Sequence, residues 1–182
     1  NGVVVITTKS GRQGLRRDFQ ISYNGGMQFR QISYLPEMQN MFGQGWNGAQ
    51  TWIENGSWGP KLDGSMQVYG PIWNSQQLIH KYQALENNVR DFFDTGVSHN
   101  HAVSLSGATN NNRMTYYMSY THTSDNGIMP SDADTYKRNT ISFRSTYNAA
   151  KWLKLSTSIN FANSSTDTVG SFHGTSVIDG IF

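Results

Sequence analysis

Tryptophans are the side chains of this 182-residue chain with the clearest binding chemistry. Four of the five tryptophans lie between residues 31 and 96, a stretch with little regular alternation of polar and apolar residues. An indole presents a large apolar face and one polar N–H, so it suits contact with a sugar ring or a peptide. The alternative is that the indoles pack a long loop together, and the loop's need for a small core of its own favours that interpretation. The candidate ligand-binding residues are Trp46, Trp52, Trp58 and Trp73.

Metal binding is a second chemistry to weigh. His99 and His101 are two residues apart, so on a strand they project from the same face as a possible ligand pair. No third ligand has a fixed spacing and the neighbouring positions on that face are apolar, so we expect both imidazoles near the end of a strand, at a polar–apolar boundary. Asp132 and Asp134 supply too few oxygen ligands for Ca²⁺, and we expect them in a solvated loop. The sequence therefore predicts no metal site and no cofactor.

Enzymatic and nucleic-acid functions find no support in the sequence. No nucleophile–base pair, phosphate-binding loop or carboxylate constellation stands out, so we expect no catalytic residues. The net charge of +2 is too small and too dispersed to predict nucleic-acid binding. The chain has no cysteine, which removes disulfides and thiolate metal sites from consideration.

The elements that position the tryptophans and histidines are long segments in which apolar and polar residues alternate. Apolar and polar side chains alternate over residues 19–30, 114–121, 138–147 and 152–161, as on strands with one apolar and one polar face. Strands of soluble domains usually have about 5–6 residues, whereas these segments sustain the pattern for roughly ten. Eleven residues span about 37 Å of strand, and at a tilt of about 40° this gives about 28 Å, close to the apolar band of about 25 Å on a membrane barrel. We therefore expect an all-β, antiparallel transmembrane β-barrel. A soluble β-sandwich also alternates and is the alternative.

The connections give these strands a direction. They are short near residues 108–112, long at 124–134 and short again at 148–151, as in outer-membrane barrels with short periplasmic turns and longer extracellular loops. The strand from Arg113 then runs outward, and residues 31–96 form one long extracellular loop. We expect short helices in this loop at residues 36–42, 75–87 and 88–93. Gly25 and Gly26 predict a bend or bulge in the first strand.

Several motifs in colinear order resemble SusC/RagA-type TonB-dependent outer-membrane transporters. They are NGVVVITTKSG at 1–11, SWGPKLDG at 57–64, NVRDFFDTGVSHNHAVSLSG at 88–107, DNGIMP at 125–130 and WLKLSTSINFANSS at 152–165. The resemblance implies that residues 1–11 are the C-terminal end of a plug domain, including its last strand. Residues 12–182 would be the first strands and extracellular loops of an incomplete barrel domain. Transporters of this size have about 22 strands around a plugged lumen. We accordingly expect a piece of a longer protein.

The same resemblance implies a function. It is TonB-dependent import of a nutrient, an oligosaccharide or a peptide, across the bacterial outer membrane. The implied partners are TonB, a SusD-like surface lipoprotein, outer-membrane lipid and the glycan or peptide ligand. Two other classes stay open. A passive porin-like channel would share the strands but gives no role to the unbroken β-branched run at residues 3–6. A soluble glycan-binding β-sandwich would share the tryptophans.

Overall fold

The computed structural model describes residues 19–51, 53, 56–109 and 112–170. Residues 1–11, which we expect to end a plug domain, and Trp52 lie outside the described residues. The chain divides into two compact units. The first, here called the sheet unit, comprises residues 1–31 and 95–168, and the second, the insertion unit, comprises residues 32–94 and 169–182.

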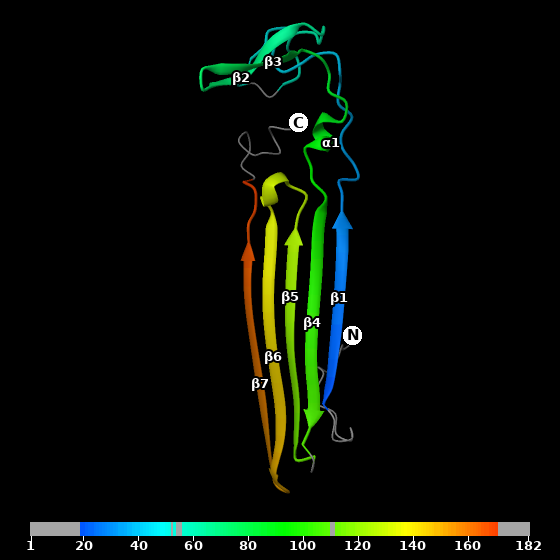
Figure 1. Ribbon diagram of the computed structural model, residues 1–182, viewed down its shortest axis with the longest axis vertical. Helices are drawn as coiled ribbons and strands as arrows, with labels where there is room; N and C mark the ends of the chain where they lie inside the picture. The colour runs from blue at the N-terminus through cyan, green and yellow to red at the C-terminus, as the bar shows by residue number, and fades with distance from the viewer. Residues whose placement is uncertain (1–18, 52, 54–55, 110–111, 171–182) are drawn as a thin grey trace, which may run out of the picture. The chain divides into compact units, whose positions relative to one another are not determined.

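The sheet unit is a single antiparallel sheet of five strands in the order β1-β4-β5-β6-β7 (Figure 1). Its strands are β1 (Gln20–Arg30), β4 (Gly96–Ala108), β5 (Met114–Asn126), β6 (Thr135–Ala150) and β7 (Leu153–Thr166). They contain 11 to 16 residues each, about twice the usual strand length. The predicted antiparallel, mostly β architecture is confirmed, and the described strands form an open sheet.

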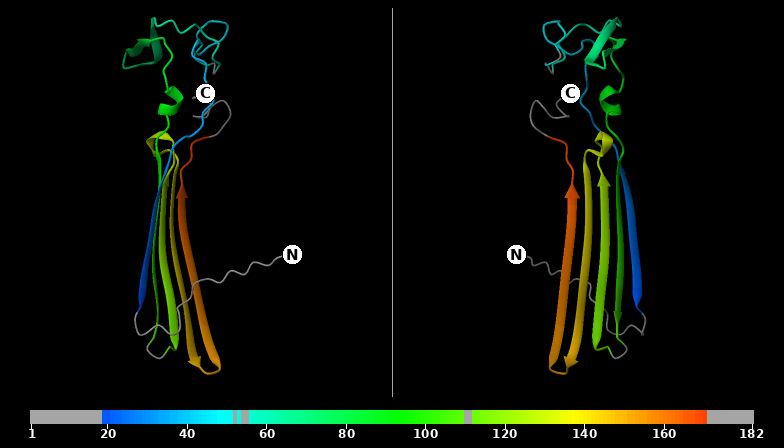
Figure 2. Two further views of the ribbon diagram at one scale, coloured as in Figure 1. Left: turned by 90° about the vertical axis from the view of Figure 1, so that its right-hand side faces the viewer. Right: turned by 60° about the vertical axis from the view of Figure 1, so that its left-hand side comes forward.

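Pairing in register gathers the apolar side chains on one face of this sheet, here called the apolar face. Directly opposite residues on antiparallel strands project to the same side, so each row of partners across the five strands shares a face. Two successive rows are wholly apolar: Ile21, Leu105, Met118, Phe143 and Ile159, then Tyr23, Val103, Tyr120, Ile141 and Phe161. Within the described part of the sheet unit, no helix or second sheet covers either face (Figure 2). Met118 is accordingly 44% exposed and Ile159 57%.

The connections of the sheet follow the predicted short–long–short pattern. Residues 109–113 join β4 to β5, and Lys151 and Trp152 form the turn between β6 and β7. The longer link from β5 to β6 contains the 3₁₀ turn η1 (Pro130–Asp132). The bulge predicted at Gly25–Gly26 is wrong, because β1 pairs with β4 without a register shift. The Tyr23 ring lies over Gly25 instead, in the space that a side chain there would need.

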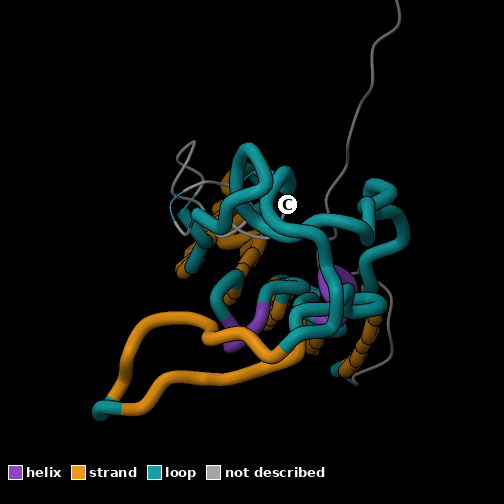
Figure 3. The backbone as a smooth tube through the Cα atoms, turned by 90° about the horizontal axis from the view of Figure 1, so that it is seen from above, coloured by secondary structure: helices purple, strands orange, loops and turns teal. Residues whose placement is uncertain are grey.

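The insertion unit contains a two-stranded hairpin, β2 (Met66–Trp73) and β3 (Gln76–Lys81), and one short helix, α1 (Asn88–Asp91). Figure 3 shows the hairpin as a ribbon that ends in its two-residue turn. The helix predicted at residues 88–93 is confirmed in α1. No helix among the described residues is long and apolar enough to cross a membrane.

The other two helices predicted in this loop are wrong, for local reasons. Residues 76–81 of the expected helix at 75–87 form β3, because Asn74 and Ser75 both have positive φ (51° and 58°), the conformation of a tight hairpin turn. At residues 36–42 the side chain of Gln39 competes with helical hydrogen bonds. Its Oε1 accepts the backbone N–H groups of Met41 (2.8 Å) and Phe42 (2.9 Å).

Candidate ligand-binding site

The tryptophan-rich loop is built on backbone pairing between residues 41–49 and 56–62. The Gly43 N–H donates to the Pro60 carbonyl (3.0 Å), and the Gly59 N–H donates to the Gly43 carbonyl (2.9 Å). The Trp58 N–H donates to the Gly45 carbonyl at 3.1 Å. A side chain at position 59 would collide with the backbone of Gln44, so glycine permits this close approach. The pairing brings Trp46 and Trp58, twelve positions apart in sequence, into one loop.

Tyr82 is the buried centre of the insertion unit, with only 3% of its surface exposed. Its hydroxyl donates to the Pro60 carbonyl at 3.4 Å, and its ring fills the space beside Gly43. Its backbone N–H donates to the Ser65 carbonyl (2.7 Å). The long loop therefore has the small core that its length requires, and within the described residues this core is made by a tyrosine and backbone glycines, while Trp46, Trp58 and Trp73 are exposed.

A tight turn at Asp63 and Gly64 connects this core to β2. The Asp63 carboxylate accepts the backbone N–H of Ser65 at 2.9 Å, and Gly64 has a φ of 78° that favours glycine. The hydrogen bonds from Ser65 lower the pKa of the Asp63 carboxyl below its ordinary value. This turn lies at the end of the SWGPKLDG segment (57–64).

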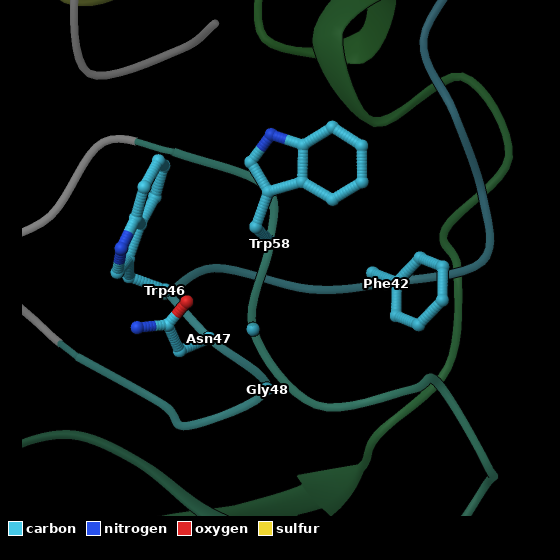
Figure 4. Close-up of a pocket in the computed structure, with 6 residues that line it drawn as sticks. Phe42, Trp46, Asn47, Gly48 and Trp58 are labelled. Carbon is cyan, nitrogen blue, oxygen red and sulfur yellow. The ribbon is translucent and has the colours of Figure 1, made fainter.

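An aromatic hollow opens beside the paired segments, with a volume of about 300 Å³. Trp46 and Trp58 project to the same side of the loop, and Asn47 lies below Trp46 (Figure 4). Both indoles are well exposed, at 57% and 66%. The lining residues are Phe42, Trp46, Asn47, Gly48, Trp58 and Gly59.

The chemistry of this hollow suits one small, flat, amphipathic group. Its volume lies at the lower end of the range for small-molecule sites, about 300–1,000 Å³. Two exposed indoles offer apolar faces, and the Asn47 amide offers a donor and an acceptor at the same wall. One sugar ring or one peptide side chain is of matching size and character.

The structure brings together two of the four predicted ligand-binding tryptophans. Trp73 ends β2, is 78% exposed and does not line the hollow. Trp52 lies outside the described residues. Sequence reasoning missed Phe42 and Asn47, although the glycines that alternate with aromatic residues in FGQGWNG (42–48) mark a backbone that packs closely around exposed rings.

Three histidines lie together on the apolar face, near the ends of β4 and β5. The ring centroid of His99 is 5.2 Å from that of His101 and 5.8 Å from that of His122. The Nδ1 of His101 is hydrogen-bonded to the Tyr23 hydroxyl (2.7 Å). The described residues contain no group of three or more histidine or acidic side chains arranged to hold a metal ion. The two histidines seen in the sequence do lie at the polar end of the apolar face, as expected.

The loop between β5 and β6 is organised by Asp134, which is half-buried, whereas Asp132 is exposed as predicted. The Asp134 carboxylate accepts the backbone N–H groups of Ile128 (3.1 Å) and Met129 (3.0 Å). A Cβ at Gly127 would overlap that carboxylate. Met129 is buried, at 6% exposure. Asp134 is thus a structural cap rather than a free oxygen ligand.

Comparison with known proteins gives one distant and partial similarity. No protein-family model matches the chain. Over 129 residues, 71% of this chain, the sequence is 30% identical to the TonB-dependent receptor SusC of Bacteroides thetaiotaomicron. The aligned part is 10% of that receptor, so the chain spans about a tenth of the relative's length. The chain is therefore similar, at the level of a family at most, to a segment of a TonB-dependent receptor.

Proposed function

We propose that this chain forms part of a TonB-dependent transporter that imports a nutrient, an oligosaccharide or a peptide, across the bacterial outer membrane. The observation that carries the proposal is the uncovered apolar face, in which two complete rows of the sheet are apolar and eight of their ten side chains are exposed. Exposed apolar patches of this extent mark contact with a membrane or a partner. The partial similarity to SusC supports the first of these.

The height of the apolar face fits a bilayer. On β7 the apolar positions run from Leu153 to Phe161, eight residue steps. At about 3.4 Å per step this is about 27 Å along the strand. A tilt of about 40° reduces it to about 21 Å, near the apolar band of about 25 Å on membrane barrels. The opposite face carries mainly serine, threonine and asparagine, as expected for a wall that meets water or a plug.

The proposed barrel requires further strands. The outer edges of β1 and β7 have no partner among the described residues. An unpaired backbone edge in hydrocarbon costs several kcal/mol per polar group, on the order of 2–7. We therefore assign residues 12–182 to the first strands and extracellular loops of a barrel that other strands of the parent protein close. Residues 1–11 are assigned to the end of a plug domain.

The aromatic hollow is the proposed contact for the imported ligand. It belongs to the segment between β1 and β4, which leaves the sheet at the same end as the β5–β6 loop. With β5 running outward, this end is extracellular, where a ligand arrives. The proposed protein partners are a SusD-like surface lipoprotein, which shares ligand binding, and TonB, which supplies energy. The protein performs no chemical reaction in this scheme.

Two measurements test the proposal in its host bacterium. The full-length protein should appear in the outer-membrane fraction and should need detergent to stay monodisperse. Recovery from the aqueous fraction without detergent would instead support the soluble β-sandwich. Deletion of the parent gene should abolish uptake of one oligosaccharide or peptide class, and loss of TonB should have the same effect. Uptake that persists without TonB would support a passive porin-like channel.

A further inference from the structure

Two adjacent rows of the sheet, here called the boundary rows, end the apolar face on the side of the β5–β6 loop. They follow directly after the row of Tyr23 and Phe161. The first comprises Gly25, His101, His122, Asn139 and Asn163, and the second comprises Met27, His99, Ser124, Lys137 and Ser165. In these two rows polar side chains replace the apolar ones on β4, β5, β6 and β7, whereas β1 keeps an apolar residue, Met27, in the second row.

Hydrogen-bond donors dominate the boundary rows. Three imidazoles, an ammonium, two hydroxyls and two amides lie side by side, and neither row contains a carboxylate. Two carboxylates lie at the row beyond them: Asp167 Oδ2 accepts the Thr135 hydroxyl at 2.8 Å, and Asp132 Oδ1 accepts the Asn126 amide at 2.6 Å. Lys137 gives the boundary rows a positive charge, and the rows are rich in hydrogen-bond donors.

Internal hydrogen bonds orient part of this cluster and leave the rest available. The His122 Nδ1 donates to Asn139 Oδ1 (2.8 Å), which also accepts the Tyr120 hydroxyl (2.7 Å). These bonds tie the cluster to the last apolar row, while the Nε2 of each ring has no partner among the described residues. The shielded Nδ1 of His99 also has none. Lys137 is exposed and makes no ion pair within the described chain.

We propose that the boundary rows bind the phosphate groups of anionic lipid headgroups, in the leaflet on the side of the β5–β6 loop. The inference rests on the proposed membrane function. One row step is about 7 Å along a strand, so the two rows lie about 7 and about 14 Å along the strands beyond the last apolar row. At a strand tilt of about 40° this is about 5–10 Å along the membrane normal, at headgroup depth. A phosphate accepts several hydrogen bonds at once from imidazole, ammonium and hydroxyl donors. The two wholly apolar rows below them point to a lipid rather than a free phosphate, because the acyl chains of the same molecule would contact those rows.

The test uses the full-length protein in nanodiscs of phosphatidylcholine that contain a minority of phosphatidic acid, whose headgroup is a phosphate monoester. Native mass spectrometry counts the phosphatidic acid molecules retained by the protein after mild activation. The boundary variant carries His99→Asn, His101→Asn, His122→Asn and Lys137→Ser. The control is Lys154→Ser, which makes the same charge change on the opposite face of the sheet. Gel mobility with and without heating shows that each variant is folded.

We expect phosphatidic acid to bind about tenfold more weakly to the boundary variant, equivalent to about 1.4 kcal/mol, and with unchanged affinity to the control. If the wild-type protein enters nanodiscs but the boundary variant retains as much phosphatidic acid, this inference fails while the membrane proposal stands. If millimolar inorganic phosphate displaces the lipid completely, the rows are a free-anion site and the inference also fails. If the wild-type protein does not enter nanodiscs, the proposed function and this inference fail together.

Discussion

The sharpest test of the membrane assignment places an arginine on each face of the same strand. Met118 lies on the apolar face of β5 in a wholly apolar row, and its neighbour Ser119 projects to the polar face. Both positions sit near the middle of the band, so Met118→Arg and Ser119→Arg differ in the face but not in the depth of the new charge. If the apolar face meets hydrocarbon, only the first substitution puts a guanidinium into lipid.

The expected difference can be worked from the position of Met118. Arginine on the lipid face of a barrel costs about 2–4 kcal/mol at the midplane and about 0–1 near the interfaces. Met118 pairs with Phe143, which pairs with Ile159, two residue steps from the centre of the span between Leu153 and Phe161. The cost should thus be near the upper range. We expect Met118→Arg to lower the free energy of unfolding by about 2–4 kcal/mol, and Ser119→Arg by less than about 1 kcal/mol.

The assay is reversible urea unfolding of the full-length protein in lipid vesicles, followed by tryptophan fluorescence. Met118→Leu serves as a second control, because it keeps the apolar contact and volume. Equal losses of stability for the two arginine variants would refute the assignment of faces. A larger loss for Ser119→Arg would mean that the serine-rich face, rather than the apolar face, meets the low-dielectric environment.

Three further predictions concern the loops. Trp58→Ala should weaken uptake of the imported ligand by about tenfold or more, as truncation of an aromatic anchor does, whereas Trp73→Ala, outside the hollow, should leave uptake kinetics unchanged. Gly127→Ala should destabilise the full-length protein by about 1–3 kcal/mol, because its Cβ would overlap the Asp134 carboxylate; Gly26→Ala, which meets open space, is the control in the same unfolding assay. The carboxyl pKa of Asp63 is lower in the folded protein than in the unfolded chain, where it is about 3.9. Asp63 therefore stabilises the fold at pH values above about 3.9, and this stabilisation is lost as the pH falls through the pKa of the folded state. Asp63→Asn should remove that small pH dependence from the free energy of unfolding. An unchanged pH dependence in this variant would contradict the stabilising role given to the Asp63 carboxylate.

Strands β1, β5, β6 and β7 could be predicted from the sequence because each carries its own signal. Alternation over ten or more residues has no helical counterpart, and every residue in the apolar rows of β5, β6 and β7 belongs to that pattern. If a strand paired one residue out of register, all its apolar side chains would lie on the polar face. The observed register therefore follows the alternation in the sequence. The tryptophan-rich loop has no such signal in its sequence. Its hollow depends on backbone bonds between Gly45 and Trp58, which no local pattern specifies.

The wrong helix at residues 75–87 shows where periodicity fails. Leu78, Ile79 and Tyr82 have helical spacing, yet a run this short fits a strand equally well. The deciding feature was the Asn74–Ser75 pair, whose left-handed conformation commits the chain to a two-residue hairpin. A second cause is tertiary. Tyr82 is needed beside Gly43 as the core of the unit, and its backbone pairs with Ser65 rather than with a helical neighbour.

Residues of the DNGIMP motif at 125–130 hold two strands together and also fix the loop that follows. Asp125 forms an ion pair with Arg30, two strands away, across β4. Gly127 leaves room for the Asp134 carboxylate that caps the following two N–H groups. The first residue of the motif therefore fastens β5 to β1, while the next ones fix the loop that leads to β6. Because these functions fall on different residues, loss of the ion pair should loosen the end of β1 without unfolding the loop. Loss of the Asp134 carboxylate should unfold the loop while the ion pair persists.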